Sequence, residues 1–326
     1  MKSHKPRIFV AGHKGMVGSA LLRLIESQNV EIITKDRKEL NLLNQQDVYY
    51  FFKNNKIDQV YLAAAKVGGI YANNSYPAEF IYENLLIQTN VIHSAFLGGV
   101  KKLLFLGSSC IYPKNNRQPI EEVDLLTGKL EPTNEPYAIS KISGIKMCES
   151  YNRQYGKSHG LDYRCLMPTN LYGPGDNYHP ENSHVIPGLI HRFHQAKINQ
   201  DKSVIIWGSG TPKREFLYVD DMARASIFLM NLEIKIYNKA TTSMNSHINV
   251  GSGVEISIAE LAKIIKKVTG FKGEIIFDRS KPDGISRKLL SSKKINELGF
   301  NSKISIIDGI NITYQNYIEA HSCPVT

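Results

Sequence analysis

The 326-residue sequence contains no long apolar run, and this absence argues against a protein that crosses a membrane. No stretch approaches the ~20 consecutive apolar residues that a bilayer-spanning helix requires. Residues 1–7 are polar and lack the apolar segment of a secretory signal. We therefore expect a soluble, cytoplasmic protein without a membrane partner.

Cysteine is scarce, and its spacing is uninformative. The chain has four cysteines, at Cys110, Cys148, Cys165 and Cys323, with no Cys-x-x-Cys pair and no cysteine–histidine spacing of a zinc site. The ten histidines are scattered and form no His-Glu-x-x-His motif. We expect neither a disulfide framework nor a bound metal.

Nucleic-acid-binding motifs are also missing, although the formal net charge is +10. There is no helix-turn-helix pattern, no aromatic RNA-binding motif and no basic tail, so we expect no nucleic-acid partner. A surplus of cations also suits a phosphate-rich small ligand or a well-solvated surface. The length allows one large domain or two medium ones.

The N-terminal segment combines a strand, a glycine loop and a helix. Residues 7–11 are apolar and β-branched, Gly12, Gly15 and Gly18 follow, and residues 19–26 have a helical pattern. Glycines let the backbone approach a pyrophosphate, and the new helix offers its free N–H groups to that anion. The spacing differs from Gly-x-Gly-x-x-Gly but predicts a nucleotide site.

The end of the next expected strand, residues 30–34, indicates which dinucleotide binds. An acidic residue there would hold the ribose hydroxyl of NAD, whereas cations accommodate the 2′-phosphate of NADP. The sequence continues Lys35, Asp36, Arg37, Lys38, and Lys14 lies in the glycine loop. These four cations favour NADPH, while Asp36 leaves NAD open.

Alternating strands and helices predict an α/β protein with a Rossmann-type doubly wound parallel sheet. Further strands are expected at 58–65, 100–106 and 163–167, and long helices at 79–97 and 134–155. Beyond residue 175 come a loop over 177–184, a helix over 185–195, a strand at 204–207 and a helix over 258–269. We expect a dinucleotide-binding domain over 1–175, to which some later segments return, and a smaller α/β substrate-binding domain over 176–326.

A tyrosine and a lysine lie four residues apart in the expected helix 134–155. Tyr137 and Lys141 would share one face of that helix, and a nearby positive charge favours the phenolate. Ser108 follows the apolar run 104–106, and ligands of open α/β sheets bind beyond the carboxyl ends of strands. The sequence therefore predicts that Ser108 meets Tyr137 and Lys141 at one site.

This combination of glycine loop, Ser108, Tyr137 and Lys141 resembles the extended short-chain dehydrogenase/reductase family. Residues 11–18, 63–70, 107–113, 182–187 and 207–210 resemble the branch of that family that converts GDP-4-keto-6-deoxy-D-mannose to GDP-L-fucose. The resemblance spans residues 7 to about 317. It implies epimerisation at C3 and C5, then NADPH-dependent reduction at C4.

The resemblance implies a role for each matched residue. Tyr137 would donate a proton in the reduction, with Lys141 lowering its pKa and Ser108 bonded to the substrate carbonyl. Cys110 and His184 would be base and acid in the epimerisation, because thiol and imidazole titrate near neutrality. The sugar nucleotide would meet Arg192, Trp207, Arg214 and Asp283. NADPH would contact Gly12, His13, Lys14, Gly15, Met16, Val17, Gly18, Lys35, Arg37, Leu40, Leu106, Gly107, Ser108, Ser109, Lys141, Pro168, Thr169, Asn170, Leu171 and His184.

Lys14 and Lys35 stand where relatives can carry arginine, which keeps the charge but loses bidentate phosphate geometry. The family also suggests a homodimer through the helices 79–97 and 134–155. Four alternatives stay open: a 4-reductase without epimerisation, an enzyme for a related sugar such as the GDP-colitose precursor, a 4-epimerase with permanently bound NAD, and a non-enzymatic NADP-sensing protein.

Overall fold

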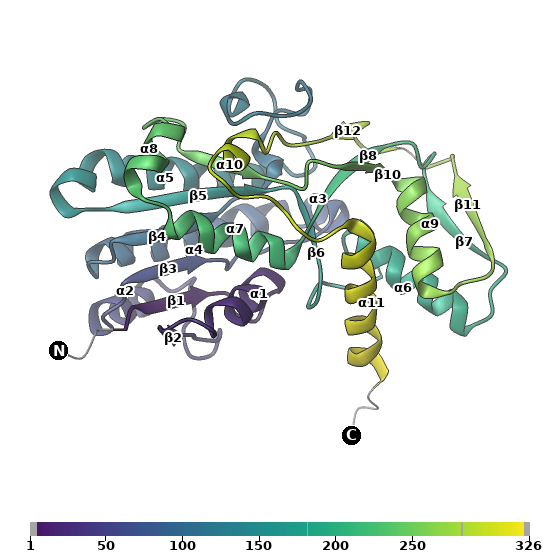
Figure 1. Ribbon diagram of the computed structural model, residues 1–326, viewed down its shortest axis with the longest axis horizontal. Coiled ribbons are helices and arrows are strands. Elements are labelled where there is room, and N and C mark those ends of the chain that lie inside the picture. Colours follow the sequence, from purple (N-terminus) through teal and green to yellow (C-terminus); the bar gives the residue numbers. More distant parts are fainter. Residues whose placement is uncertain (1–4, 181, 282, 323–326) are drawn as a thin grey trace.

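The computed structural model describes residues 5–180, 182–281 and 283–322. Within these ranges, no helix combines the length and the apolar character that a membrane span requires. Two parts of unequal size lie side by side along the long axis, and the C-terminal helix α11 (Ile306–Ser322) is the helix of the smaller part that faces the larger one (Figure 1).

The larger part is built on a six-stranded sheet in which every neighbouring pair is parallel. Its strand order is β2-β1-β3-β4-β5-β9, so the chain reverses direction across the sheet between β1 and β3. Such a reversal opens a crevice at the carboxyl ends of the strands, and this arrangement confirms the predicted fold class. The strands are β1 (Arg7–Ala11), β2 (Glu31–Ile33), β3 (Gln59–Leu62), β4 (Lys102–Leu106), β5 (Asp162–Pro168) and β9 (His247–Val250).

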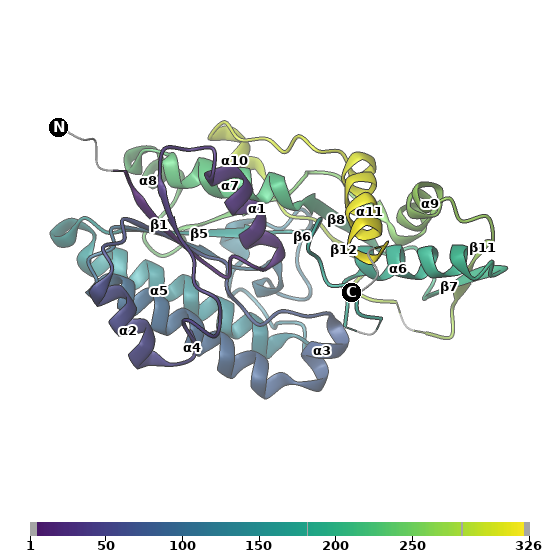
Figure 2. The same cartoon turned by 90° about the horizontal axis from the view of Figure 1, so that it is seen from below.

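Helices cover both faces of this sheet, because its strands are apolar on both sides (Figure 2). Along β1, Phe9 belongs to one buried cluster, and its neighbours Ile8 and Val10 belong to the other. The first cluster is completed by α2 (Gln45–Asn54), α4 (Pro77–Leu97) and α5 (Glu135–His159). The second is completed by α1 (Met16–Ile25), α7 (Val219–Asn231), α8 (Ile234–Ala240) and α10 (Lys293–Glu297).

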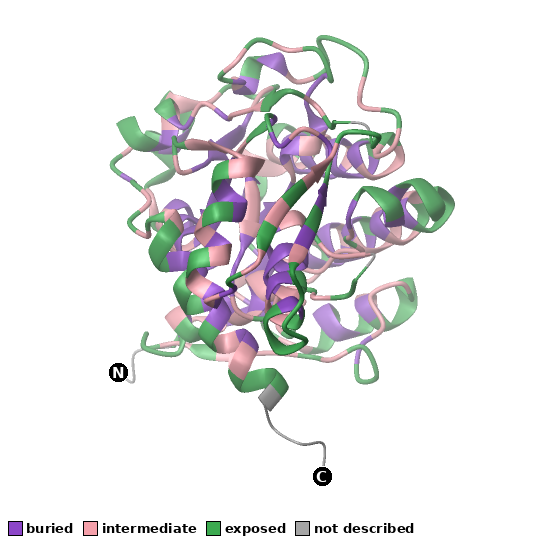
Figure 3. Cartoon of the chain, turned by 90° about the vertical axis from the view of Figure 1, so that its right-hand side faces the viewer, coloured by how far each residue is buried: buried purple, intermediate pink, exposed green. Residues whose placement is uncertain are grey.

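The smaller part has its own apolar cluster. It contains α6 (Val185–Ile198), α9 (Ile258–Thr269), α11 and the parallel pair β7 (Ser203–Trp207) and β11 (Glu274–Asp278). A sheet of β10 (Glu255–Ser257), β8 (Lys213–Tyr218) and β12 (Arg287–Lys288), with β6 (Asn170–Tyr172) on β8, connects it to the larger part. Figure 3 shows this end of the molecule, where exposed and buried residues alternate along β7.

Most of the expected elements occur close to their predicted bounds. The first helix, however, begins at Met16 instead of residue 19, so its N-terminus lies inside the glycine loop. The expected helix 134–155 runs from Glu135 to His159, and Gly160 ends it in the left-handed conformation. The sequence pattern predicts no helix at the positions of α2, α7 or α11. Because β9 joins the main sheet, a late segment does return to the larger part, while the division at residue 175 stays a prediction.

Candidate active site

The glycine loop forms a cradle that only glycine permits at two positions. Gly12 has φ +85°, and a Cβ there would lie 2.6 Å from the backbone nitrogen of Ala64. A Cβ on Gly18 would collide with the carbonyl oxygen of Gly12. Gly15 precedes α1, and no side chain caps the helix N-terminus. The free N–H groups and the close backbone approach fit the pyrophosphate of a dinucleotide, as predicted for this loop.

The cations after β2 are partly neutralised by two acidic neighbours. Lys14 bonds Asp36 at 3.0 Å, and Lys35 bonds Glu39 at 2.9 Å. The hydrogen bond from Lys14 is the main reason why the pKa of Asp36 is lowered. Arg37 is exposed, and in the described residues no acid pairs with it. Arg37 and the equally exposed Lys38 are therefore the cations here that stay available to meet a phosphate, and Asp36 is a compensated charge.

The segment after β4 brings Ser108, Cys110 and Tyr137 together. The Cys110 backbone N–H donates to the Ser108 Oγ at 3.3 Å, which opens a short 3₁₀ turn over Ser109–Ile111. Tyr137, at the start of α5, lies close enough to the Ser108 hydroxyl and the Cys110 thiol for both to affect its pKa. The structure therefore brings these three predicted residues together, with the two hydroxyls near the thiol.

The pKa of Tyr137 is raised, whereas the Lys141 spacing predicted that it would be lowered. Burial raises it well above its ordinary value, a negative charge on Cys110 would raise it further, and only the Ser108 hydrogen bond opposes them. Lys141 is buried too, and burial lowers its pKa to about 8. Its ammonium lies 5.9 Å from the centre of the Tyr137 ring. Desolvation thus outweighs the Lys141 charge, and the expected lowering of the Tyr137 pKa is absent from this arrangement.

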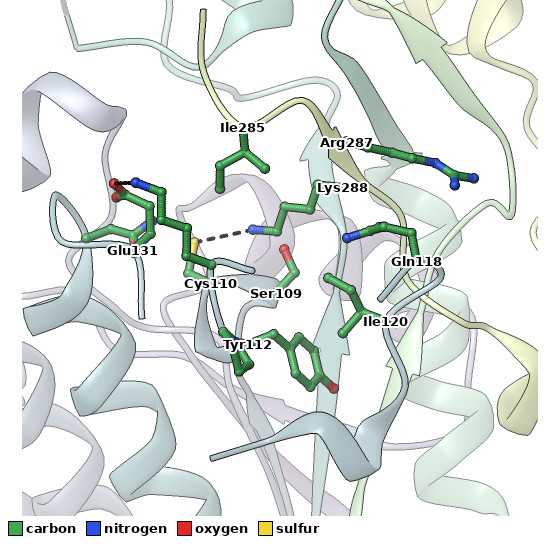
Figure 4. A pocket seen from close by; sticks show the side chains of 12 residues that line it. Ser109, Cys110, Tyr112, Gln118, Ile120, Glu131, Ile285, Arg287 and Lys288 are labelled. Carbon is green, nitrogen blue, oxygen red and sulfur yellow. Dashed lines mark hydrogen bonds and ion pairs between the residues drawn. The ribbon is translucent and has the colours of Figure 1, made fainter. Parts of the chain in front are cut away.

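A small pocket with a cavity volume of about 20 Å³ lies against Cys110 and opens to solvent. Figure 4 shows Cys110 and Lys288 pointing toward each other across it. The pocket is lined by Ser109, Cys110, Tyr112, Pro113, Lys114, Gln118, Ile120, Glu131, Asn134, Ile285, Arg287 and Lys288. Three separate stretches of sequence contribute these side chains, so the pocket exists only in the folded chain.

The floor of this pocket is fixed by a buried polar network below Tyr112. The Tyr112 hydroxyl donates to the Asn249 Oδ1 at 2.5 Å and lies 3.0 Å from the His247 Nε2. Burial lowers the pKa of His247 to about 3, so its ring is neutral. The Asn249 N–H donates to Glu122 at 3.0 Å, and Lys294 lies 3.5 Å from the same carboxylate. Buried networks of this kind hold one conformation, here that of the turn carrying Cys110.

His184 stands immediately before α6, at its N-cap. The loop before it touches the glycines after β3, because the Gly69 N–H donates to the Asn182 carbonyl at 3.3 Å. A Cβ on Gly69 would lie 2.9 Å from the Ser183 carbonyl oxygen. His184 is exposed, yet enough protein surrounds it for desolvation to lower its pKa. In the described part of the chain, no direct contact joins His184 to Cys110.

The four predicted substrate-binding residues gather around the end of β7 and the segments beside it. The Arg192 Nη1 donates to the Ile205 carbonyl at 3.2 Å, and the exposed Trp207 follows two residues later. Asp283 accepts from the Ser209 backbone and hydroxyl at 2.8 and 2.7 Å. Arg214 on β8 lies next to Gly284, and burial lowers the pKa of both arginines. Two guanidiniums suit a diphosphate, and the exposed Trp207 indole, with the Lys281 Nζ 5.5 Å from its ring centre, suits an aromatic base.

Sequence reasoning missed Glu215 and Lys288. The Glu215 carboxylate is fully buried and accepts from the backbone of Gly253 at 2.7 Å and of Leu290 at 3.1 Å. The Glu215 carbonyl accepts from Asn170 at 2.8 Å, so this residue links the predicted cofactor-binding segment to the residues that follow β12. The apolar run 216–218 directly after Glu215 was a sequence signal that this carboxylate is buried. No sequence signal points to Lys288, which is 178 positions from Cys110.

Comparison with known proteins decides the family. A family model described as "NAD dependent epimerase/dehydratase family" matches residues 8–251. The chain belongs to this family. It is 58% identical to "GDP-L-fucose synthase" of Escherichia coli K12 over 316 residues, which cover 97% of each chain. Family membership confirms the predicted nicotinamide cofactor and the prediction of an enzyme.

Solved structures agree with this assignment. A GDP-6-OMe-4-keto-L-xylo-heptose reductase from C. jejuni is 40% identical, covers 97% of this chain and 99% of its own, and has a TM-score of 0.90. A GDP-L-fucose synthetase from Naegleria fowleri bound to NADP is 26% identical, covers 99% and 97%, and has a TM-score of 0.86. The first acts on a GDP-keto sugar, and the second binds the cofactor that the β2 segment predicted.

Proposed function

We propose that this chain inverts C3 and C5 of GDP-4-keto-6-deoxy-D-mannose and then reduces C4 with NADPH to give GDP-L-fucose. The observation that carries the proposal is the position of Cys110 within charge-interaction range of Tyr137, on a turn that Ser108 caps. It places a thiol beside the hydroxyl pair of a reductase. The full-length likeness to a GDP-L-fucose synthase supports the same reaction.

In the epimerisation, the C4 ketone acidifies the hydrogens on C3 and C5. The Cys110 thiolate removes a proton from one face, and the His184 imidazolium returns one to the opposite face. The lowered pKa of His184 makes its imidazolium a stronger proton donor, at the cost of a smaller protonated fraction at neutral pH. Ser108 and Tyr137 donate hydrogen bonds to the enolate oxygen at C4.

In the reduction, NADPH supplies a hydride to C4. Tyr137 protonates the oxygen at C4, and its raised pKa keeps the phenol protonated until that oxygen becomes basic enough to take the proton. Lys141 ties the start of α5 to the end of β4 through its hydrogen bond to Leu106 at 2.8 Å. The glycine loop and the N-terminus of α1 hold the dinucleotide pyrophosphate, and Arg37 takes the 2′-phosphate.

The substrate nucleotide lies along the end of β7 in this proposal. Arg192 and Arg214 bind the diphosphate, and Trp207 stacks on the guanine. Asp283 holds the turn at Ser209, which follows Trp207 by two residues. The support for this placement is that Trp207 is 70% exposed, although tryptophan side chains are usually largely buried, and that the Lys281 Nζ lies 5.5 Å from the centre of its ring.

We also infer a homodimer through α4 and α5, which pack against each other on one face of the sheet. Their outer surfaces carry exposed apolar side chains, among them Tyr82 at 63%, Leu97 at 52% and Ile139 at 40%. Light scattering on the purified chain tests this, and Tyr82→Glu should shift the mass toward the monomer. A cytoplasmic location fits the same reaction, because both substrates are anions that do not cross membranes unaided.

The test is NADPH consumption with GDP-4-keto-6-deoxy-D-mannose, with the product identified by NMR, for wild type and Cys110→Ser. GDP-L-fucose from the wild type and its loss in the variant, with NADPH binding intact, is the expected result. An unepimerised C4-reduced product from the wild type would remove the proposed roles of Cys110 and His184.

A second candidate is favoured by the likeness to the C. jejuni heptose reductase. In this alternative the chain reduces a related GDP-4-keto sugar, with or without epimerisation. Turnover of such a sugar, and none of the 6-deoxy-mannose compound, would select it.

A further inference from the structure

Lys288 reaches the Cys110 thiol from a distant part of the sequence. Its Nζ lies 3.9 Å from the Cys110 Sγ, and both residues line the same pocket (Figure 4). Lys288 is partly buried, as is the thiol. A positive charge thus lies against the sulfur in a site only partly open to water.

The backbone around Lys288 is held on several sides. In the parallel pairing of β12 with β8, Lys288 lies opposite Arg214. The next residue, Leu289, donates its N–H to the Gln118 side chain at 2.7 Å, and Leu290 donates to the buried Glu215 at 3.1 Å. The position of the lysine is therefore built into the fold.

The other cations near this pocket have carboxylate partners. Arg287 bonds Glu255 at 2.6 Å and points away from Cys110, because successive strand residues face opposite sides. Lys114 lies 3.8 Å from Glu131. Over the described ranges, the Lys288 ammonium has no such carboxylate, and its partner is the Cys110 sulfur.

Resting on the proposed role of Cys110 as the epimerisation base, we propose that Lys288 is the positioning residue that stabilises the Cys110 thiolate. Its ammonium favours sulfur as S⁻ over S–H and holds it toward the sugar. The thiol proton leaves to solvent before catalysis. On attack at C3 or C5, the sulfur takes the carbon-bound proton and becomes S–H, while the ammonium stays protonated throughout.

A different role for Lys288 would be to bind the substrate diphosphate or a sugar hydroxyl. Loss of the lysine would then raise the KM without changing the chemistry of the thiol. The two roles are separable, because alkylation of Cys110 needs no substrate.

The experiment measures the rate of Cys110 alkylation by iodoacetamide against pH in the full chain, by mass spectrometry of the Cys110 peptide. Lys288→Met should lower this rate about tenfold at neutral pH and move its half-maximum about one pH unit higher, because loss of the charge favours the thiol. Lys288→Gln, which can still hydrogen bond, should behave like Lys288→Met, and Lys288→Arg should stay near wild type. Lys114→Met is the matched control, since it removes a pocket cation that does not touch the sulfur.

A second experiment measures deuterium incorporation into the GDP sugar during turnover with NADPH in deuterated water. Lys288→Met should incorporate about tenfold less deuterium at C3 and C5 and give more unepimerised product, which a merely structural role would not do selectively. Circular dichroism checks the fold, and Lys288→Gln replaces Lys288→Met if the latter does not fold. An alkylation profile identical to wild type would overturn the proposal. If the wild type does not turn over this sugar, the proposed function is wrong. The alkylation experiment still decides the role of Lys288, because it needs no substrate.

Discussion

The Nζ of Lys141 donates a 2.8 Å hydrogen bond to the carbonyl oxygen of Leu106, the last residue of β4. This bond ties α5 to the strand whose end carries Ser108. The tyrosine and lysine that the helix spacing places on one face are therefore not bonded to each other. Each instead contacts the end of β4, Tyr137 through Ser108 and Lys141 through Leu106.

Removing the Tyr137 hydroxyl should stop the reduction without unfolding the chain. In Tyr137→Phe we expect kcat to fall at least about 100-fold, because the C4 oxygen loses its proton donor. NADPH affinity should stay within about twofold of wild type, since general acid catalysis, not cofactor binding, is lost. The matched control is Tyr155→Phe, which alters a hydroxyl on the same helix that bonds only Gln154 among the described contacts. Wild-type turnover in Tyr137→Phe would contradict the assignment.

Lys141 should make stability depend on pH in the alkaline range. Burial lowers its pKa from 10.5 to about 8, so the unfolded chain binds more protons than the folded chain between these values. The penalty for the buried charge is fully present below pH 8 and is relieved as pH rises through this window. We therefore compare the free energy of unfolding of wild type with that of Lys141→Met. The difference, wild type minus variant, should increase by a few kcal/mol as the pH rises from 8 to 10.5.

Urea denaturation of both proteins at neutral pH and near pH 10 measures this difference. The lost hydrogen bond to Leu106 adds a constant offset, so only the change with pH is diagnostic. A difference that stayed flat or fell over this range would mean that Lys141 is not desolvated.

Two glycines of the same loop should respond differently to a methyl group. Gly18→Ala places a Cβ on the carbonyl oxygen of Gly12 and should weaken NADPH binding at least about tenfold, because the loop must open. Gly15→Ala meets the same oxygen at 3.4 Å and has φ −76°, so we expect near wild-type affinity. Fluorescence titration with NADPH compares the two variants, and equal losses would argue against the cradle.

Trp207 offers a direct optical test of the nucleotide site, because it is the only tryptophan in the chain. GDP should change its fluorescence on binding. Trp207→Ala should raise the KM for the GDP sugar about tenfold, the scale of one lost base–aromatic stack. The side chain is 70% exposed, so the free energy of unfolding should change by less than about 0.5 kcal/mol. If saturating GDP left the tryptophan fluorescence unchanged, the guanine would bind away from Trp207.

Local sequence determined the parts of the protein that depend on neighbours along the chain. The apolar runs that became β1, β4 and β5, the loop of Gly12, Gly15 and Gly18, and the helical spacing of Tyr137 and Lys141 were all predicted. Each depends on backbone freedom, side-chain periodicity or helix geometry, which act over a few residues. The parallel sheet followed from the alternation of these elements.

Tertiary structure decided whatever depends on contacts between distant segments. Burial, which no local pattern measures, reversed the expected direction of the Tyr137 pKa. Lys288 meets Cys110 only because β12 pairs with β8 and Glu215 holds the residues that follow β12. The sequence by itself therefore determined which reactive groups are present. Folding decided which charges face them, because electrostatic interactions depend on distance and on the exclusion of solvent.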